Sequence, residues 1–283
     1  RVVRNFADHY RFRMYFSDSD CFLPAVSMMR VWLVGAIVRY WTILILLVFW
    51  QVLVTVNDYN SIVAPSPIQV GTAFLSDPEY FMFHAWYTLS SALGGLILGI
   101  AMGTIVASLS WATPLFNGLL MPMSLFFRSI PIVAMIPIIV RLVGYGSHSV
   151  IMITAILTFF PCYLLFLSGL EDVNSTRKDF FSSLNCQPKG FKMLTFFRYL
   201  ALPSAMPNLL VSVRLLAPIC ILVALVTEFL MGLQGLGYVM TSARSTLRMD
   251  VSLAAAIISC LLSVGFFLVA SAVEQKYRSR WSD

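Results

Sequence analysis

Four ionisable side chains stand inside long apolar runs of this sequence and are the first candidates for chemistry. They are Arg128, Arg141, Arg214 and Glu228. A charge inside a bilayer is costly, so such residues usually face the interior of a helix bundle or a water-filled path. Arg214 and Glu228 are too far apart to pair on one straight helix, because their spacing corresponds to about 21 Å of helical rise. Each of them therefore needs a partner elsewhere or water.

Residues next to Arg128 break the helix and add candidates for a polar path. Ser129 follows Arg128 directly, and Pro131 comes two residues later, where it cannot supply the backbone hydrogen bond of a regular helix. The residues expected to line a translocation path are Arg128, Ser129, Pro131, Arg141 and Glu228. For Arg141 and Arg214 a second interpretation stays open, in which the side chain extends to the lipid headgroups.

The sequence contains no motif for catalysis or cofactor binding. None of the four lysines follows a glycine, so there is no phosphate-binding P-loop and this chain is not expected to hydrolyse ATP. There is no HExxH or GxSxG motif, and the five cysteines form no CxxC pair. His84 and His148 fall near predicted helix ends, where the favoured interpretation is an interfacial polar residue. The sequence predicts no enzyme, no metal site and no cofactor in this chain.

The polar segment 170–205 holds a second set of candidates. Phe180, Phe181 and Leu184 fall on one face of a predicted short helix. Asn185 can end that helix in the left-handed conformation. An exposed aromatic face of this kind suits docking into a groove on a partner protein. A helix lying against the membrane surface would show the same pattern, and the segment alone does not separate the two.

Composition assigns the chain to the membrane. Of its 283 residues, 59% are hydrophobic and 11% are charged, whereas a soluble domain has about 25% charged residues. About 20 apolar residues cross a bilayer, and the charge-free runs give room for six such helices. The predicted spans are 34–56, 86–109, 115–142, 147–169, 206–230 and 250–273. The fold class is therefore an all-α polytopic membrane protein.

Prolines shape two of the predicted regions. Pro122, Pro131 and Pro137 interrupt the third span. Such breaks survive in lipid only where neighbouring helices or water satisfy the freed backbone groups, so this span is expected to face the protein interior. The connection 57–85 is expected to contain a short surface helix after Pro67.

Basic residues predict the orientation. Fourteen of the nineteen lysines and arginines fall in 1–39, 170–205 and the C-terminal tail. Only Arg244 and Arg248 fall in the opposite connections, which are 57–85, 143–146 and 231–249. Cytoplasmic loops carry such an excess, so both termini are expected in the cytoplasm, and the net charge of +6 does not call for a nucleic acid partner. The expected parts are a cytoplasmic segment 1–33, a transmembrane domain 34–273 and a cytoplasmic tail 274–283.

Several motifs between Trp50 and Tyr277 are informative through their order and spacing. They are Ala64-Pro-Ser-Pro67, Thr88-Leu89 followed by Gly94, Gly99 and Gly103, Pro131-Ile-Val-Ala-Met-Ile-Pro137 with Gly144-Tyr-Gly146, Leu202-Pro-Ser-Ala-Met-Pro207, and Thr227-Glu228-Phe-Leu with Gly235-Leu-Gly-Tyr238. Together they resemble the membrane permease subunits of binding-protein-dependent ABC importers, and among them the nitrate/sulfonate/taurine/bicarbonate-type group. The resemblance implies a type I ABC importer permease fold.

The hallmark of that family is a cytoplasmic Glu-Ala-Ala-x-x-x-Gly loop, the EAA loop. In one register Asp179-Phe-Phe181 takes the Glu-Ala-Ala place and Asn185 the Gly place. A second register puts Gly190 on the Gly and Leu184-Asn-Cys186 on Glu-Ala-Ala. We prefer the first, because the segment upstream fits it. The resemblance then assigns the contact with the ATPase to Asp179, Phe180, Phe181, Ser182, Leu184 and Asn185.

The resemblance implies a multi-subunit importer in a bacterial inner membrane. It would contain two permease chains, identical more readily than different, two cytoplasmic ATP-binding subunits that hold ATP and Mg²⁺, and an extracytoplasmic substrate-binding protein. This chain would form the substrate path and couple to the ATPase through 170–205. The implied substrate is a small anion, a sulfonate-like solute or a vitamin precursor.

A channel or secondary transporter that works without ATP is the alternative function. Secondary transporters often contain internal repeats, and the two halves of this sequence show no such similarity. A membrane-embedded enzyme is disfavoured, because no nucleophile and base occur together. An export or assembly factor with a permease-like fold would need no binding protein.

Overall fold

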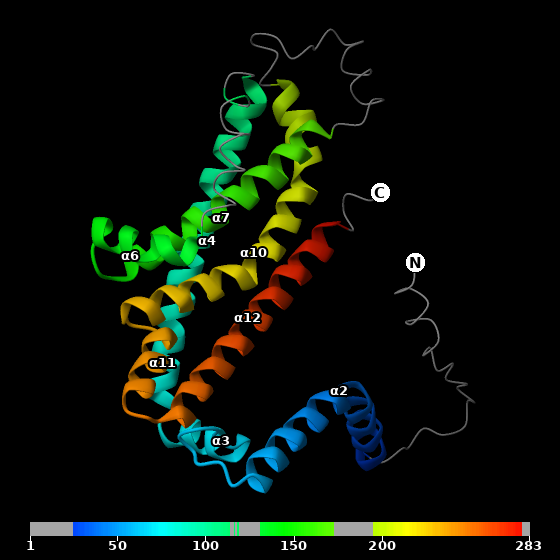
Figure 1. Ribbon diagram of the computed structural model, residues 1–283. Coiled ribbons are helices and arrows are strands. Elements are labelled where there is room, and N and C mark those ends of the chain that lie inside the picture. The colour runs from blue at the N-terminus through cyan, green and yellow to red at the C-terminus, as the bar shows by residue number, and fades with distance from the viewer. Residues whose placement is uncertain (1–24, 114–115, 117, 119–130, 173–194, 279–283) are drawn as a thin grey trace, which may run out of the picture. The chain divides into compact units, whose positions relative to one another are not determined.

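The computed structural model describes residues 25–113, 116, 118, 131–172 and 195–278, and within these ranges the chain is helical with no strand (Figure 1). The chain divides into two units, 1–56 and 57–283, which are described separately. In the first unit, α2 (Ala25–Val56) covers the predicted first span and begins before it. Its stretch Trp41–Val56 is apolar.

The second unit opens with the short helix α3 (Pro67–Ser76). Ser66 is its N-cap and forms a capping box with Gln69. The N–H of Gln69 donates to Ser66 Oγ at 3.3 Å, and Gln69 Oε1 accepts from the N–H of Ser66 at 2.9 Å. The short helix predicted after the prolines is confirmed.

The helix α4 (Pro78–Ala112) begins well before the predicted span 86–109. Asp77 caps it, because its Oδ1 accepts from the N–H of Tyr80 at 3.1 Å. Pro78 occupies the first turn, where its missing N–H costs nothing. The acidic cap and the proline start the helix outside the apolar run, which explains why hydrophobicity alone placed its start too late.

A row of glycines brings α4 against α7 (Ser147–Glu171). A Cβ added to Gly95 would lie 2.7 Å from Thr154 Cγ2, and one added to Gly99 would lie 2.8 Å from the carbonyl oxygen of Ala155. The two backbones are therefore closer than any larger residue permits, as at other small-residue interfaces between membrane helices. The predicted fourth span, 147–169, is confirmed as α7.

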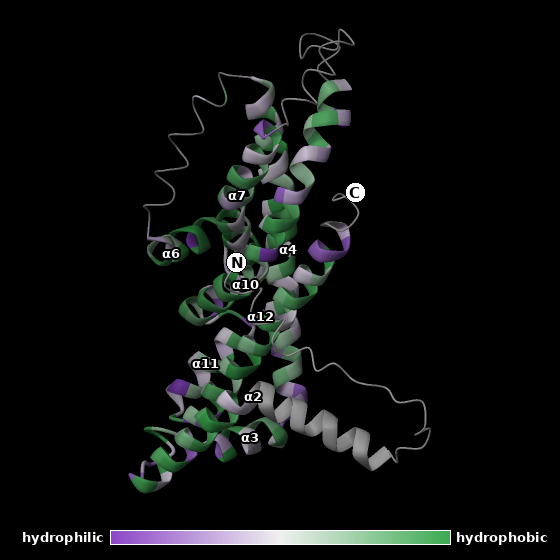
Figure 2. Cartoon of the chain, turned by 90° about the vertical axis from the view of Figure 1, so that its right-hand side faces the viewer, coloured by the Kyte–Doolittle hydropathy of each residue, from purple (hydrophilic) through white to green (hydrophobic). Residues whose placement is uncertain are grey.

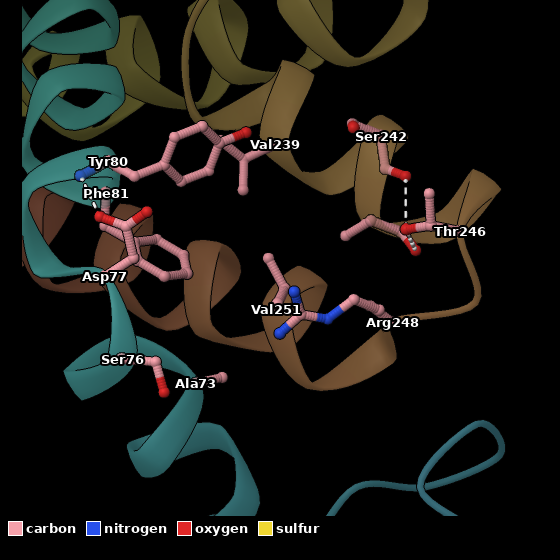
Figure 3. Close-up of a pocket in the computed structure, with 11 residues that line it drawn as sticks. Ala73, Ser76, Asp77, Tyr80, Phe81, Val239, Ser242, Thr246, Arg248 and Val251 are labelled. Atoms are coloured by element: carbon pink, nitrogen blue, oxygen red, sulfur yellow. Dashed lines mark hydrogen bonds between the residues drawn. The ribbon is translucent and has the colours of Figure 1, made fainter.

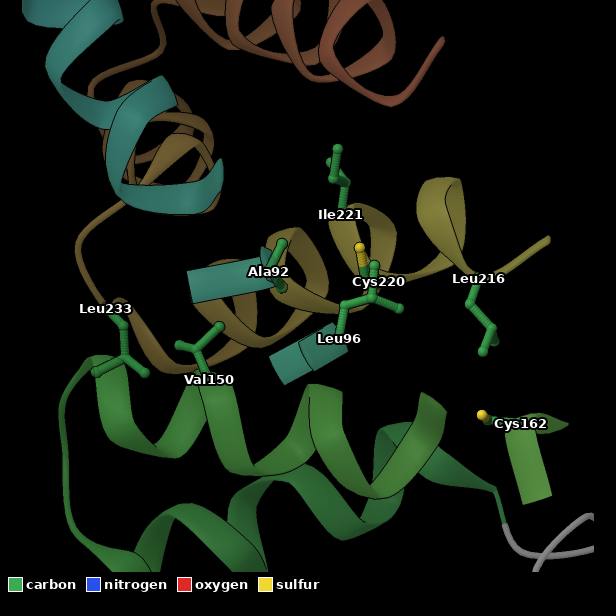
Figure 4. Close-up of a cluster of buried hydrophobic side chains, with 9 residues drawn as sticks. Ala92, Leu96, Val150, Cys162, Leu216, Cys220, Ile221 and Leu233 are labelled. Atoms are coloured by element: carbon green, nitrogen blue, oxygen red, sulfur yellow. The ribbon is translucent and has the colours of Figure 1, made fainter. Parts of the chain in front are cut away.

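The core of the second unit lies where α10 (Leu202–Met231) packs on α4 and α7. Figure 4 shows this cluster, which contains both small and branched side chains. Its buried members are Ala92, Leu96, Val150, Cys162, Leu216, Cys220, Ile221, Ala224 and Leu233. The two cysteines act here as small apolar side chains.

A π-helical turn, η1 (Phe197–Ala201), leads directly into α10. The N–H of Leu202 donates to the carbonyl of Phe197, five residues back. Pro203 has no N–H, and in a regular helix its ring would collide with the carbonyl four residues before it. The wider turn ahead of Pro203 accommodates the proline, so the helical segment begins earlier than the predicted fifth span.

The helix α6 (Ile132–Val143) is the described end of the predicted third span. Pro131 is its N-cap and Pro137 lies inside it. Ile136 and Val140 are buried against α7 and α10. One face of α6 therefore packs inside the unit.

Two helices complete the second unit, α11 (Leu236–Ser245) and α12 (Met249–Arg278). The segment 231–249 is predicted as a connection, and the helix α11 inside it is not predicted. The predicted sixth span also ends too early, because α12 continues into the predicted tail.

Four helical segments in the described ranges are long and apolar enough to cross a membrane. They are Pro78–Ala112, Ser147–Glu171, Phe197–Ser245 and Met249–Tyr277. Figure 2 shows hydrophobic residues along them. They correspond to the predicted second, fourth, fifth and sixth spans. The described apolar parts of α2 and α6 are shorter, so the count of six stays a prediction.

The close contact of α4 with α7 gives a stability prediction. Gly99→Ala should lower the free energy of unfolding by about 1–3 kcal/mol, because the added methyl group overpacks the contact. The matched control is Gly265→Ala on α12, where nothing lies within 4 Å of an added Cβ. Unfolding in detergent measures both variants, and equal stability would contradict the close contact.

Candidate functional site

A buried carboxyl group joins three helices of the second unit. Glu228, on α10, has no exposed surface. Its Oε2 accepts a hydrogen bond from Thr88 Oγ1 on α4 at 2.8 Å. The same oxygen accepts a second bond from the N–H of Gly237 on α11, at 3.1 Å. Burial of a polar group is costly unless it is hydrogen-bonded, so these two donors are what allow Glu228 to lie here.

The same side chains satisfy the first backbone amides of α11. The N–H of Leu236 donates to Thr88 Oγ1 at 2.8 Å, and the N–H of Gly235 donates to Nδ1 of His84 at 3.2 Å. With the N–H of Gly237 on Glu228, three successive amides end on side chains from α4 and α10. We call this group, formed by His84, Thr88 and Glu228 with residues 235–237, the α11 cap.

Two glycines allow the α11 cap to form. Gly235 has φ of 136°, a region in which other residues are strained, and a Cβ there would collide with the carboxyl group of Glu228. A Cβ on Gly237 would lie 2.5 Å from the backbone nitrogen of Phe229. The start of α11 therefore approaches α10 backbone to backbone.

The electrostatics of the α11 cap come from the helix rather than from a cation. A carboxyl group is favoured at a helix N-terminus, where the unpaired N–H groups carry partial positive charge. In the part of the chain that the structure describes, the two ion pairs involve other residues. Glu228 Oε1 has no hydrogen-bond partner among the described residues. The partners that Glu228 was expected to need are the hydroxyl group of Thr88 and the backbone amide of Gly237.

Arg214 pairs with a carboxylate inside the chain. Its Nη1 lies 2.8 Å from Oε2 of Glu274 on α12. Glu274 is buried, whereas Arg214 is about one third exposed. The interpretation that Arg214 extends to the headgroups is therefore replaced by an ion pair between α10 and α12. Glu274 had been assigned to the cytoplasmic tail, and α12 carries it into the packed part of the unit.

The remaining predicted path residues do not share one surface. Pro131 and Arg141 are exposed at the start and in the last turn of α6, whereas Glu228 is fully buried. Arg128 and Ser129 lie outside the described residues. So do the predicted coupling residues Asp179, Phe180, Phe181, Ser182, Leu184 and Asn185. Their roles stay predictions.

Sequence reasoning missed two members of the α11 cap, His84 and Thr88. His84, predicted as an interfacial polar residue, is buried inside the unit, where it accepts from the N–H of Gly235 and stacks on Tyr238 with ring centroids 5.7 Å apart. His84 and Thr88 stand four residues apart on one helix face. That spacing indicates that the two side chains point the same way. The sequence does not indicate that this face of the helix contacts the start of α11.

A polar pocket lies beside the far end of α11, between the α3–α4 and α11–α12 junctions (Figure 3). Its volume is about 270 Å³. Arg248 reaches into it and lies 3.6 Å from Asp250, a long and solvent-exposed ion pair. The other lining residues include Ser76, Asp77, Tyr80, Ser242 and Thr246. This α11 pocket offers hydroxyl groups and both signs of charge.

The family of the chain is shown by comparison with known proteins. A family model described as "binding-protein-dependent transport system inner membrane component" matches residues 95–279. The chain belongs to this family. It is therefore a membrane-embedded permease subunit of an ABC importer, which agrees with the resemblance read from the motifs.

Curated relatives support the narrower group. A probable ABC transporter permease protein of Haemophilus influenzae is 28% identical over 81% of this chain and 90% of its own length. The formylaminopyrimidine transport permease protein of Halalkalibacterium halodurans is 32% identical over 62% of this chain and 68% of its own. The taurine transport system permease protein of Escherichia coli is 29% identical over 62% and 61%. These relatives are named as transport permeases, not as enzymes.

Solved structures show that the fold is shared. A crystal structure of an amino acid ABC transporter matches with a TM-score of 0.60 at 16% identity, over 72% of this chain and 97% of the other. The MetNI methionine ABC transporter in an inward-facing conformation matches with a TM-score of 0.54 at 18% identity, over 70% and 98%. The predicted permease fold is confirmed.

The ion pair between α10 and α12 gives a second prediction. Arg214→Met should lower the free energy of unfolding by about 1–3 kcal/mol, because the ion pair of Arg214 with the buried Glu274 is lost. Arg248→Met, at the exposed pair, should change it by less than about 1 kcal/mol. Unfolding of both variants in one detergent measures the difference, and equal effects would contradict the assigned burial of Glu274.

Proposed function

We propose that this chain forms the substrate path of an ATP-driven importer and couples it to cytoplasmic ATPases through the segment 170–205. The family match carries the proposal, because it extends over this segment as well as over α7, α10 and α12. The partners are two ATP-binding subunits, which hold ATP and Mg²⁺, a second permease chain and an extracytoplasmic binding protein. We favour two identical permease chains over two different ones.

Packing at both ends of the proposed coupling segment supports this function. Leu170, at the end of α7, is fully buried in one cluster with Ala201, the last residue of η1, and Ala205, near the start of α10. Tyr163 and Phe166 of α7 complete that cluster. Because interiors are close-packed and transmit displacement, a shift of the segment 170–205 would move α7 and α10 together.

An aromatic contact extends this connection to α4. Trp111, near the end of α4, stacks on Phe196 with ring centroids 6.0 Å apart and contacts Phe197 at 5.5 Å. These two phenylalanines stand at the π turn that leads into α10. Movement at the segment 170–205 would therefore reach α4, α7 and α10, and we propose that these helices tilt together to expose the path to either side.

We propose that the substrate path is formed by the residues predicted for it from the sequence. Arg128, Ser129 and Pro131 stand where the third span is interrupted, and Arg141 is exposed on α6. Glu228 is fully buried, and we propose that it influences the path by holding the start of α11 in place. The proposed orientation puts both termini and 170–205 in the cytoplasm and the α11 pocket outside, where the binding protein docks.

The proposed substrate is a small anion, a sulfonate-like solute or a vitamin precursor. The relatives are named for formylaminopyrimidine, taurine, aliphatic sulfonates and riboflavin. Arginine binds carboxylate, sulfonate and phosphate oxygens well through its planar group of donors. The exposed Arg141 gives the path such a group.

Replacing Phe180 and Phe181 by Asp tests the coupling. The change should abolish substrate-stimulated ATPase activity while the chain still inserts, because two charges replace the apolar face that docks in the ATPase groove. Tyr59→Asp, at an exposed aromatic residue on the opposite side, is the control. Persistence of stimulated activity would refute the coupling segment, and a transporter that works with no copurifying ATPase would favour the channel alternative.

Transport assays with paired solutes test Arg141. Arg141→Ala should reduce uptake of an anionic substrate about tenfold more than uptake of a neutral analogue, as expected when one charged contact is lost. Arg244→Ala removes another exposed arginine in the last turn of a helix and should not discriminate between them. An equal loss for both solutes would remove Arg141 from substrate recognition.

A further inference from the structure

The start of α11 is held by side chains that belong to other helices. In the α11 cap, Thr88 and His84 come from α4, and Glu228 comes from α10. We propose that Thr88 is a positioning residue for transport, which fixes α11 to α4 so that the two helices move as one body. This inference rests on the proposed function, because it assumes that α4 moves when the transporter works.

The hydroxyl group of Thr88 is suited to this role because it serves two partners at once. It donates to Glu228 Oε2 and accepts from the N–H of Leu236, both at 2.8 Å. The carbonyl of His84 lies farther away, at 3.2 Å, so the single hydroxyl hydrogen is better placed on the carboxyl group. Thr88 is fully buried, and water cannot replace either partner there.

The bonds of α11 to α10 and to α4 are separable. Thr241 Oγ1, in the middle of α11, donates to the carbonyl of Phe229 on α10 at 2.8 Å. Gly237 also binds α10, through Glu228. The direct hydrogen bonds to α4 in the described part of the chain come from Thr88 and His84. Loss of the Thr88 hydroxyl would therefore remove one of these two hydrogen-bonded links to α4 and leave the bonds from α11 to α10 in place.

Through the position of α11, the Thr88 link connects α4 to the α11 pocket. One end of α11 contacts α4 at the cap, and the other end lines the α11 pocket through Ser242 and Thr246. The helix α4 is packed on α7 through Gly95 and Gly99, and α7 leads into 170–205. A displacement that begins at 170–205 thus reaches the α11 pocket by way of α4 and the Thr88 link.

Thr88→Val and Thr88→Ser form a matched pair for the test. Valine keeps the shape but loses both hydrogen bonds, whereas serine keeps both. The purified transporter with all its subunits, reconstituted in lipid, is measured in two ways. These are amide hydrogen exchange of residues 235–240 and the number of substrate molecules moved per ATP hydrolysed.

In Thr88→Val, exchange of 235–240 should rise roughly tenfold, since loss of a buried hydrogen bond shifts a local opening by about that factor. Transport per ATP should fall about fivefold, the size of effect that residues on a coupling route have. Thr88→Ser should match the wild type in both. His84→Phe keeps the ring beside Tyr238 and loses the acceptor, and it should change both values in the same direction.

The outcomes separate this inference from the proposed function. Unchanged exchange in Thr88→Val would show that the link is absent. Faster exchange with unchanged transport per ATP would show that Thr88 has only a structural role, and either result overturns the inference. Should Thr88→Val not assemble, His84→Phe decides by the same two measurements. A wild-type complex without substrate-stimulated ATPase activity would instead refute the proposed function.

Discussion

The structure depends on one constraint, which is that backbone N–H and C=O groups need hydrogen-bond partners wherever water is excluded. A continuous helix meets this constraint by itself, but each helix start leaves amides unpaired. At α3 and α4 the nearby residues Ser66 and Asp77 supply the acceptors. At α11 no nearby side chain does so, and acceptors come from α4 and α10 instead. A local requirement of the backbone has thus become a tertiary contact among three helices.

The helix α4 is the element through which most of these contacts pass. Its glycines bring it against α7, its residues His84 and Thr88 hold the start of α11, and Trp111 near its end packs on the residues that precede α10. The contact with α7 is formed by small residues, whereas the contacts with α11 and with the residues before α10 are formed by polar or aromatic ones. Because all of them lie on one helix, its position depends on three neighbours at once.

The sequence predicted the apolar helices well and their ends poorly. Charge-free runs correctly predicted four long apolar helices. Pro67 correctly predicted the start of α3. The start of α4 depends on Asp77, outside the apolar run, and α11 is too short and too polar to show an apolar pattern. Glu228 and Arg214 were recognised as needing partners. The partners themselves, Thr88 and Glu274, are brought near only by the fold, and no local pattern identifies them.

The π turn before α10 has a consequence for the direction in which the preceding segment faces. Each residue of an α-helix turns the chain by about 100°, and a π turn contains one residue more than an α turn. Thr195 and Phe196, the described residues before Phe197, are therefore rotated about the helix axis by roughly that angle relative to an uninterrupted helix. The register of this turn sets the rotation of Thr195 and Phe196 about the helix axis relative to α10. Loss or gain of a single residue there would turn these two residues by about 100° relative to α10.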